Sequence, residues 1–194
     1  MSHFSDQQLI TGLVQGDRIA FKAFIDRYKH MVYTLAMRVL RNKEDAEEIA
    51  QDTFIKALQS INGFKGEAKL STWVYKIAYH KCLDYVKKNK RRPQTDSWEW
   101  QDHDRITASE EEWDILEAQE KRQIINRALA RLPGDDGVLL TLFYFETFSL
   151  KEISGILDLS LNTVKVRLHR SRKRLAGILG KMMDEQTISM YGKK

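Results

Sequence analysis

Apolar residues recur three and four positions apart along most of this 194-residue sequence, and that spacing most constrains its fold. Such a repeat places the apolar side chains on one face of an α-helix. The sequence contains two prolines, so long helices can run without interruption. Ser5, Asn42 and Ser149 stand just before such stretches, and their side chains are of the kind that cap helices. We therefore predict an all-α fold.

Charge divides the sequence into three parts. Residues 1–92 hold 17 basic and 10 acidic side chains, residues 93–120 hold 1 and 10, and residues 121–194 hold 14 and 7. Basic regions favour nucleic acid, although runs of charge are also common on solvated faces. The distribution predicts two small helical domains joined by an acidic linker. We place the first domain at residues 1–92, the linker with the start of the next helix at 93–118, and the second domain, with a short tail, at 119–194.

The second predicted domain contains a candidate helix-turn-helix at residues 149–179. Ser149 and Glu152 predict a capping box for its first helix, and a short turn separates this helix from a basic second helix. Six of the ten residues 165–174 are Lys or Arg. The second helix of such a motif enters the major groove, where its first turns contact bases and later residues hold phosphates. A basic amphipathic helix at the protein surface is the alternative interpretation.

Aromatic and basic residues interleave through residues 64–92. Trp73 and His80 are expected on one face of a helix that opens at Ser71 and stops at Pro93. Flat rings beside cations suit unstacked bases and a phosphate backbone, and a Gly-flanked loop before the helix can receive a flipped base. From composition alone, aromatics packed in the core are an equally good interpretation.

Asp45, Glu48 and Asp52 form an acidic stripe at helical spacing, opposite an apolar stripe within residues 46–58. The stripe is either a solvated helix face or a docking surface for a basic partner.

Several segments match one known family in order along the chain. These segments are residues 45–54 (DAEEIAQDTF), 64–66 (FKG), 71–78 (STWVYKIA), 132–133 (LP), 149–153 (SLKEI) and 163–170 (TVKVRLHR). Together they resemble bacterial RNA polymerase sigma factors of the extracytoplasmic-function (ECF) group, over nearly the full length of the chain. The resemblance implies a sigma region 2-like domain at residues 1–92 and a sigma region 4-like domain at residues 119–194.

The resemblance also implies roles for residues of the first domain. The acidic stripe would dock on the clamp coiled coil of core RNA polymerase through Asp45, Glu48, Gln51 and Asp52. The loop and the basic helix would recognise and melt the promoter element near the start site, with Trp73 as a wedge at the upstream edge of the bubble. The residues implied in this task are Phe64, Lys65, Lys69, Thr72, Trp73, Lys76 and His80. His80 stands where the family usually has Asn.

In the second domain, the resemblance implies that the basic helix reads the upstream promoter element. The residues implied are Thr163, Lys165, Val166, Arg167, His169, Arg170, Arg172 and Arg174. Val166 replaces a small polar residue that is usual in the family. Asp135, Asp136 and Gly137 follow Leu132-Pro133 at positions where basic or polar residues are commoner.

The partners implied by the resemblance are core RNA polymerase (clamp coiled coil and flap), promoter DNA in double- and single-stranded form, and an anti-sigma factor. No cofactor, metal or catalytic residue is expected, because such a factor leaves the chemistry to the polymerase. A polar N-terminus and the absence of an apolar run of about 20 residues predict a cytoplasmic protein that does not insert into membranes. The acidic segment is also a candidate screen for the basic surface in a compact, inhibited form.

Two other functions are compatible with parts of this sequence. A helix-turn-helix regulator that acts without a polymerase holoenzyme would be a dimer on a palindromic site, and it leaves residues 64–92 unexplained. An enzyme acting on DNA would need a nucleophile or a carboxylate metal cluster, and the five histidines lack ligand spacing. The single cysteine, Cys82, lies near His80, and we interpret it as a buried thiol beside a surface histidine. We reject the enzyme.

Overall fold

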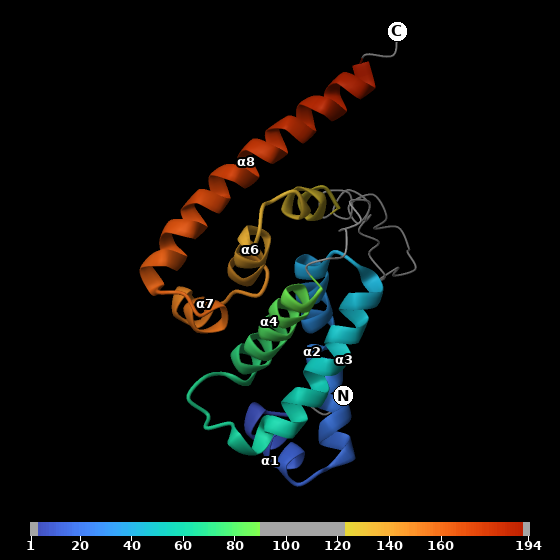
Figure 1. Ribbon diagram of the computed structural model, residues 1–194, viewed down its shortest axis with the longest axis vertical. Coiled ribbons are helices and arrows are strands. Elements are labelled where there is room, and N and C mark those ends of the chain that lie inside the picture. The colour runs from blue at the N-terminus through green and yellow to red at the C-terminus, as the bar shows by residue number, and fades with distance from the viewer. Residues whose placement is uncertain (1–3, 90–122, 192–194) are drawn as a thin grey trace, which may run out of the picture. The chain divides into compact units, whose positions relative to one another are not determined.

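The computed structural model describes residues 4–89 and 123–191, with side-chain surroundings given as far as Met182 (Figure 1). Every regular element in these two stretches is helical, which confirms the all-α prediction. None of the helices in the described stretches is long and apolar enough to cross a bilayer. By their contacts, the described elements form two compact units, which are presented separately.

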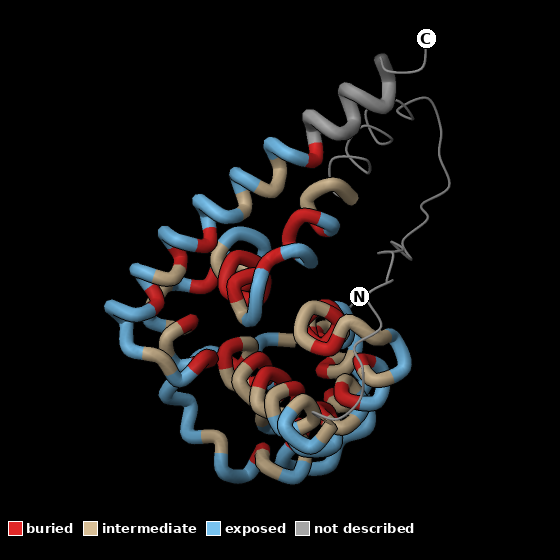
Figure 2. Tube along the Cα trace, turned by 45° about the horizontal axis from the view of Figure 1, so that its top comes forward, coloured by how far each residue is buried: buried red, intermediate tan, exposed pale blue. Residues whose placement is uncertain are grey.

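Four helices and a short turn build most of the first unit. They are α1 (Asp6–Val14), α2 (Arg18–Leu40), α3 (Lys43–Ser60), the 3-10 turn η1 (Ile61–Gly63) and α4 (Leu70–Lys88). Helices α2, α3 and α4 all pack against one another, and α1 packs against α2. Phe24 lies at the centre, with its ring edge-to-face to Tyr28 at 5.3 Å and to Phe54 at 5.7 Å. Figure 2 shows the buried residues of these helices on their facing sides.

Local hydrogen bonds explain where these helices begin. Gln8 N donates to Ser5 Oγ and Ser5 N donates to Gln8 Oε1, a capping box that starts α1. Asn42 Oδ1 accepts from the backbone of Asp45 and starts α3, as predicted. Helix α4 differs slightly from prediction, because it begins at Leu70 rather than Ser71 and ends at Lys88. The predicted stop at Pro93 lies outside the described residues.

The first unit also includes α7 (Leu150–Leu157), the helix predicted to open the helix-turn-helix. The predicted capping box between Ser149 and Glu152 opens this helix. It ends at Asp158, whose backbone is left-handed with φ of 51°. Helix α7 packs against α4, as Figure 1 shows. This compact unit therefore extends beyond the stretch predicted as the first domain, and the domain boundaries stay a prediction.

The second unit contains the helix at residues 123–130, α6 (Asp136–Tyr144) and α8 (Leu161–Tyr191). Helix α6 is buried over most of its length. It begins at Asp136. A Cβ on Gly137 would lie 2.9 Å from the Leu129 carbonyl oxygen, which shows how closely the two backbones approach. Helix α8 continues beyond Leu179, the predicted end of the helix-turn-helix.

Candidate nucleic-acid interface

The loop that precedes α4 brings an aromatic pair to the start of that helix. Trp73 and Phe64 are both half-buried, with ring centroids 5.1 Å apart and planes tilted by 51°. Gly66 lets the loop turn, since its φ is 72°. Lys65 and Lys69 are exposed on either side of this turn. The arrangement offers ring faces for stacking next to cations for phosphate.

Two other aromatics of α4, Tyr75 and Tyr79, are core residues. Tyr75 is 1% exposed and Tyr79 is 4% exposed, so neither ring can stack on a base. Of the aromatic residues interleaved with basic ones, Trp73 therefore stays at the surface, while Tyr75 and Tyr79 pack inward. Thr72, one of the implied promoter residues, is also buried.

Helix α7 covers the middle of the implied promoter surface of α4. Asp158 contacts two side chains of α4, with Oδ1 2.6 Å from Lys76 Nζ and Oδ2 2.9 Å from His80 Nε2. Glu152 Oε1 lies 3.0 Å from Lys69 Nζ and accepts from the Thr72 hydroxyl at 3.5 Å. These contacts of Asp158 and Glu152, together with the ring contact of Tyr75 and Phe148, are called the α4–α7 contact.

An aromatic contact lies beside these ion pairs. The rings of Tyr75 and Phe148 meet edge-to-face with centroids 5.0 Å apart, and both side chains are buried. Phe148 comes directly before the cap of α7. The α4–α7 contact therefore combines an apolar part with polar groups at its rim.

Both carboxylates of the α4–α7 contact are held ionised. The Ser149 hydroxyl, with help from Lys69, lowers the pKa of Glu152 to about 2. The Lys76 ammonium donates to Asp158 and lowers the pKa of that carboxyl below its ordinary value, and His80 adds to the effect. At neutral pH both groups carry a full negative charge toward α4.

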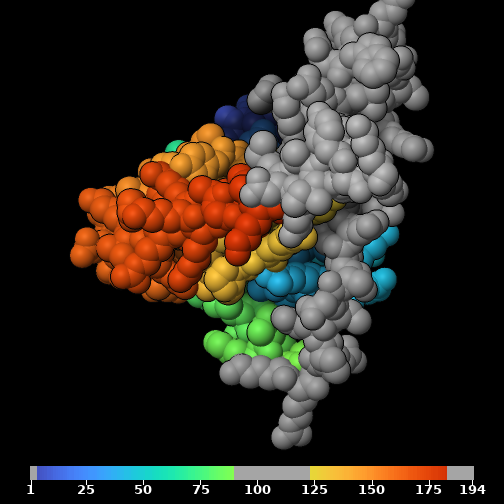
Figure 3. Space-filling view, turned by 90° about the horizontal axis from the view of Figure 1, so that it is seen from above, coloured from blue at the N-terminus to red at the C-terminus, as the bar shows by residue number. Residues whose placement is uncertain are grey.

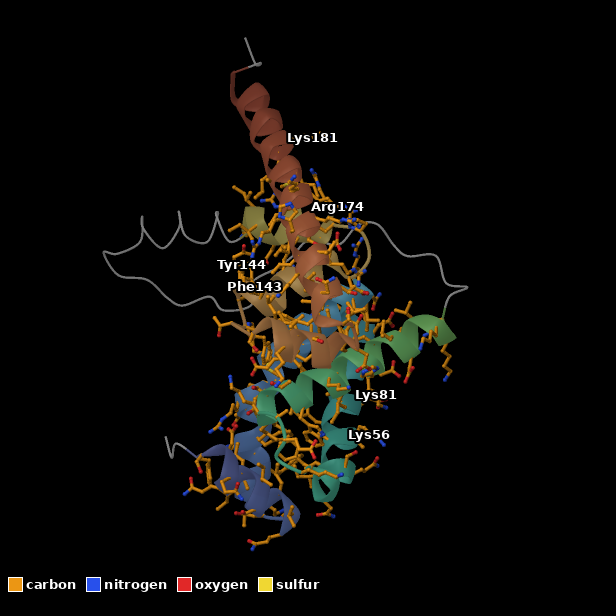
Figure 4. All side chains as sticks on the ribbon, turned by 90° about the vertical axis from the view of Figure 1, so that its left-hand side faces the viewer. Lys56, Lys81, Phe143, Tyr144, Arg174 and Lys181 are labelled. Atoms are coloured by element: carbon orange, nitrogen blue, oxygen red, sulfur yellow. The ribbon has the colours of Figure 1, made fainter. Side chains whose placement is uncertain are left out.

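The implied polymerase-docking residues share one side of α3. Glu48 and Gln51 are exposed, while Asp45 and Asp52 are half-buried. Asp52 Oδ2 accepts from Lys81 Nζ of α4 at 3.2 Å, and Lys81 is labelled in Figure 4. Within the acidic stripe, Asp52 is thus already paired with a lysine of the same unit.

The basic residues implied in upstream recognition lie on α8, whose orange-to-red surface is visible in Figure 3. All are exposed except Arg167, which is half-buried, and the opposite side of the helix buries Val164, Leu168 and Ser171. This helix is therefore amphipathic, with its basic residues on the exposed side.

Two of these arginines have partners within the second unit. Arg174 donates to Asp136 Oδ2 at 2.5 Å, and the Asp136 side chain is only 6% exposed. The Arg172 guanidinium lies 5.3 Å from the ring centre of Phe143 and 5.4 Å from that of Tyr144. Figure 4 labels Arg174 and the two rings. Sequence reasoning missed both contacts, because each joins residues far apart in the sequence, 38 positions in the case of Arg174 and Asp136.

The described part of the chain holds no group of three or more His, Cys, Asp or Glu residues placed to bind a metal ion. Cys82 is completely buried in α4, whereas His80 is partly exposed and contacts Asp158. The interpretation of Cys82 as a buried thiol is confirmed.

Burial raises the pKa of the Cys82 thiol to about 12, so we expect it to be inert in the folded protein. At pH 8 a thiol-specific disulfide reagent should label the native chain about 1000-fold more slowly than the chain in denaturant. The absorbance of the released thiolate measures both rates. Prompt labelling of the native chain would show that α4 opens readily.

Comparison with known proteins matches both ends of the chain to one family. A model of sigma-70 region 2 matches residues 24–92, and a model of sigma-70 region 4 matches residues 122–175. These matches fall on either side of the acidic segment and agree with two helical domains.

Whole-length relatives and solved structures agree with these matches. The ECF RNA polymerase sigma-E factor of Escherichia coli K12 is 30% identical over 177 residues, covering 88% of this chain and 92% of that protein. The RNA polymerase sigma-H factor of Pseudomonas aeruginosa is 27% identical over 187 residues, covering 93% and 96%. The structure of CnrH in complex with the cytosolic domain of CnrY shares the fold, with a TM-score of 0.64, 20% identity and coverage of 91% and 97%. The sigma factor RpoE in complex with the anti-sigma factor NepR from Bartonella quintana has a TM-score of 0.65, 20% identity and coverage of 82% and 96%.

Proposed function

The chain belongs to the ECF sigma factors of RNA polymerase, and on that premise we propose how it recognises and opens a promoter. It is a transcription initiation factor that directs RNA polymerase to promoters, and it is not an enzyme. We propose that the start of α4 and its preceding loop melt and read the downstream element. We propose that α8 reads the upstream element in the major groove.

The observation that carries the melting proposal is the pair of Trp73 and Phe64 beside exposed cations. Stacking on an aromatic ring stabilises an unstacked base by about 1–3 kcal/mol, whatever the base. Lys65 and Lys69 are exposed in the loop that carries Phe64 and leads to Trp73, and they suit the phosphates of the same strand. Strand opening would then be driven by binding energy to extruded bases, without a nucleotide-hydrolysing step of the protein itself.

For the upstream element, we propose Lys165, Arg167 and Arg170 as the residues that contact bases. They lie in the first turns of α8, where a recognition helix contacts base edges. Arg172 and Arg174 come later on the helix and already contact side chains of the second unit. They suit positions along the phosphate backbone rather than base readout.

The docking proposal assigns the acidic side of α3 to a basic surface of core polymerase, the clamp coiled coil. We expect Glu48→Lys to weaken binding of core polymerase at least tenfold, because it places a cation against the cations of the partner. Fluorescence anisotropy of labelled protein titrated with core enzyme measures the change. Asp26→Lys, an equal charge change at an exposed site on α2, is the matched control. Equal affinities for the two variants and the wild type would contradict the assignment.

The proposed function is tested by run-off transcription with purified bacterial core polymerase and a genomic promoter library, with this protein added or omitted. Discrete new transcripts that depend on the protein are expected, and their start sites give the promoter sequence. Tight binding of duplex DNA by the protein alone, without polymerase association or transcripts, would instead favour the helix-turn-helix regulator.

We also propose an anti-sigma factor as a regulatory partner and the cytoplasm as the place of action. The RpoE structure from Bartonella quintana contains the anti-sigma factor NepR, and the CnrH structure contains the cytosolic domain of CnrY. Co-purification of the tagged protein from its own host, with and without stress, tests this partner.

A further inference from the structure

We propose that Phe143 and Tyr144 are positioning residues that hold Arg172 for contact with a phosphate of duplex DNA. The proposal rests on the proposed function, which places α8 in the major groove of the upstream element. The two rings stand at the end of α6, outside the helix that contacts the bases, and both are labelled in Figure 4. Upstream recognition would then depend on a pair of rings in a second helix as well as on the cations of α8.

The guanidinium of Arg172 sits in a corner formed by the two rings. The rings of Phe143 and Tyr144 are almost perpendicular, with planes at 84° and centroids 5.0 Å apart. The central carbon of the guanidinium lies 5.3 Å from the Phe143 centroid and 5.4 Å from the Tyr144 centroid. Two ring contacts at once restrict the rotamers of a long side chain that would otherwise move freely in solvent. They therefore fix where the charge of Arg172 lies.

The ring contacts leave the charge of Arg172 available to a phosphate. Both rings are uncharged, and a planar guanidinium that stacks on a ring keeps N–H donors at its edge that suit phosphate oxygens. Arg174 differs, because it donates to the buried carboxylate of Asp136, which offsets its charge within the unit. The acidic segment predicted as a screen for the basic surface lies outside the described residues. Of the two arginines, Arg172 is therefore the fixed cation whose full charge faces solvent.

Arg172 also lies on the same side of α8 as Lys165, which is proposed to contact bases. Lys165, His169 and Arg172 recur at spacings of four and three, so they share one face of the helix, and all three are exposed. With a rise of about 1.5 Å per residue, Arg172 is about 10 Å along the helix axis from Lys165. The major groove is about 12 Å wide, so a helix that reads bases through Lys165 brings Arg172 close to the phosphates at the groove edge.

Two substitutions separate the position of this charge from its presence. Tyr144→Ala keeps the charge and releases the side chain, so we expect it to weaken binding of duplex DNA about fivefold, from the lost cation–π contact and the cost of ordering Arg172 on binding. The dependence of affinity on salt should not change. Arg172→Ala should weaken binding further and reduce the slope of log affinity against log salt by about 0.9, because one phosphate contact is lost.

The measurement is the affinity of each full-length protein for a fluorescein-labelled 20-base-pair duplex of random sequence, followed by anisotropy over a series of salt concentrations. A random sequence suffices, since phosphate contacts carry no sequence information. The decisive comparison is a double-mutant cycle: Tyr144→Ala should have no further effect in the Arg172→Ala protein. A purely structural role of the Tyr144 ring would persist in that background.

Two control variants accompany the cycle. Tyr144→Phe keeps a ring against Arg172 and should bind DNA as the wild type does. Phe145→Ala removes the neighbouring ring, which is 49% exposed against 52% for Tyr144, and should leave binding and salt dependence unchanged. Thermal unfolding checks that every variant folds.

Three outcomes would overturn the positioning role. The first is equal affinity for the wild type and Tyr144→Ala, or no binding of the duplex by the wild type at the lowest salt. The second is an equal loss in Phe145→Ala. The third is a loss from Tyr144→Ala that persists in the Arg172→Ala protein. Run-off transcription with the wild type tests the proposed function separately: transcripts alongside any of these outcomes leave the sigma activity standing, whereas the expected coupling without transcripts keeps the positioning role and removes the promoter role.

Discussion

Trp73→Ala is expected to lower the run-off transcript made with core RNA polymerase by up to about 100-fold on a duplex promoter. The indole is half-buried against Phe64, with enough of its surface exposed to contact a base. Loss of one base–aromatic stack costs about 1–3 kcal/mol, and tenfold in an equilibrium corresponds to about 1.4 kcal/mol. The cost falls on strand opening, so permanganate reactivity of thymines in the bubble should fall together with the transcript.

Two controls assign this effect to melting. Trp73→Phe keeps a ring at the site and should retain most of the activity. A template whose bubble is already mismatched removes the cost of opening, so the defect of Trp73→Ala should shrink on it. A full transcript yield from Trp73→Ala on duplex DNA would contradict the assigned role.

Arg174→Ala is expected to lower the free energy of unfolding of the second unit by about 2–3 kcal/mol. Asp136 lies in the first turn of α6 with its carboxylate almost fully buried, and Arg174 donates to it at 2.5 Å. Removal of the guanidinium leaves a buried charge without this partner, which is far costlier than the loss of a surface ion pair. Urea unfolding followed by circular dichroism measures the change.

Arg170→Ala serves as the comparison on the same helix. Arg170 is exposed, so its loss should leave stability unchanged and weaken binding of promoter DNA. Asp136→Asn introduced together with Arg174→Ala should restore part of the lost stability, because a neutral amide is less costly to bury. If Arg174→Ala unfolds as the wild type does and weakens DNA binding as much as Arg170→Ala, its main role is phosphate contact.

Sequence alone determined the elements whose causes are local. The capping boxes at Ser5 and Ser149 were predictable because a cap depends on residues three apart. The apolar and basic sides of α8 followed from its helical spacing. Family membership was also readable, since collinear motifs need no tertiary information.

Tertiary structure decided which aromatic residues of α4 are buried and which distant residues pair, because helical spacing determines neither. Trp73, Tyr75 and Tyr79 share one basic, aromatic helix, and only packing against neighbouring helices sends the tyrosines inward and leaves the tryptophan at the surface. The contact of Arg174 with Asp136 joins residues 38 positions apart, and that of Lys76 with Asp158 joins residues 82 apart. No local pattern encodes such pairs, because they form only when separate helices are brought together by burial of their apolar faces.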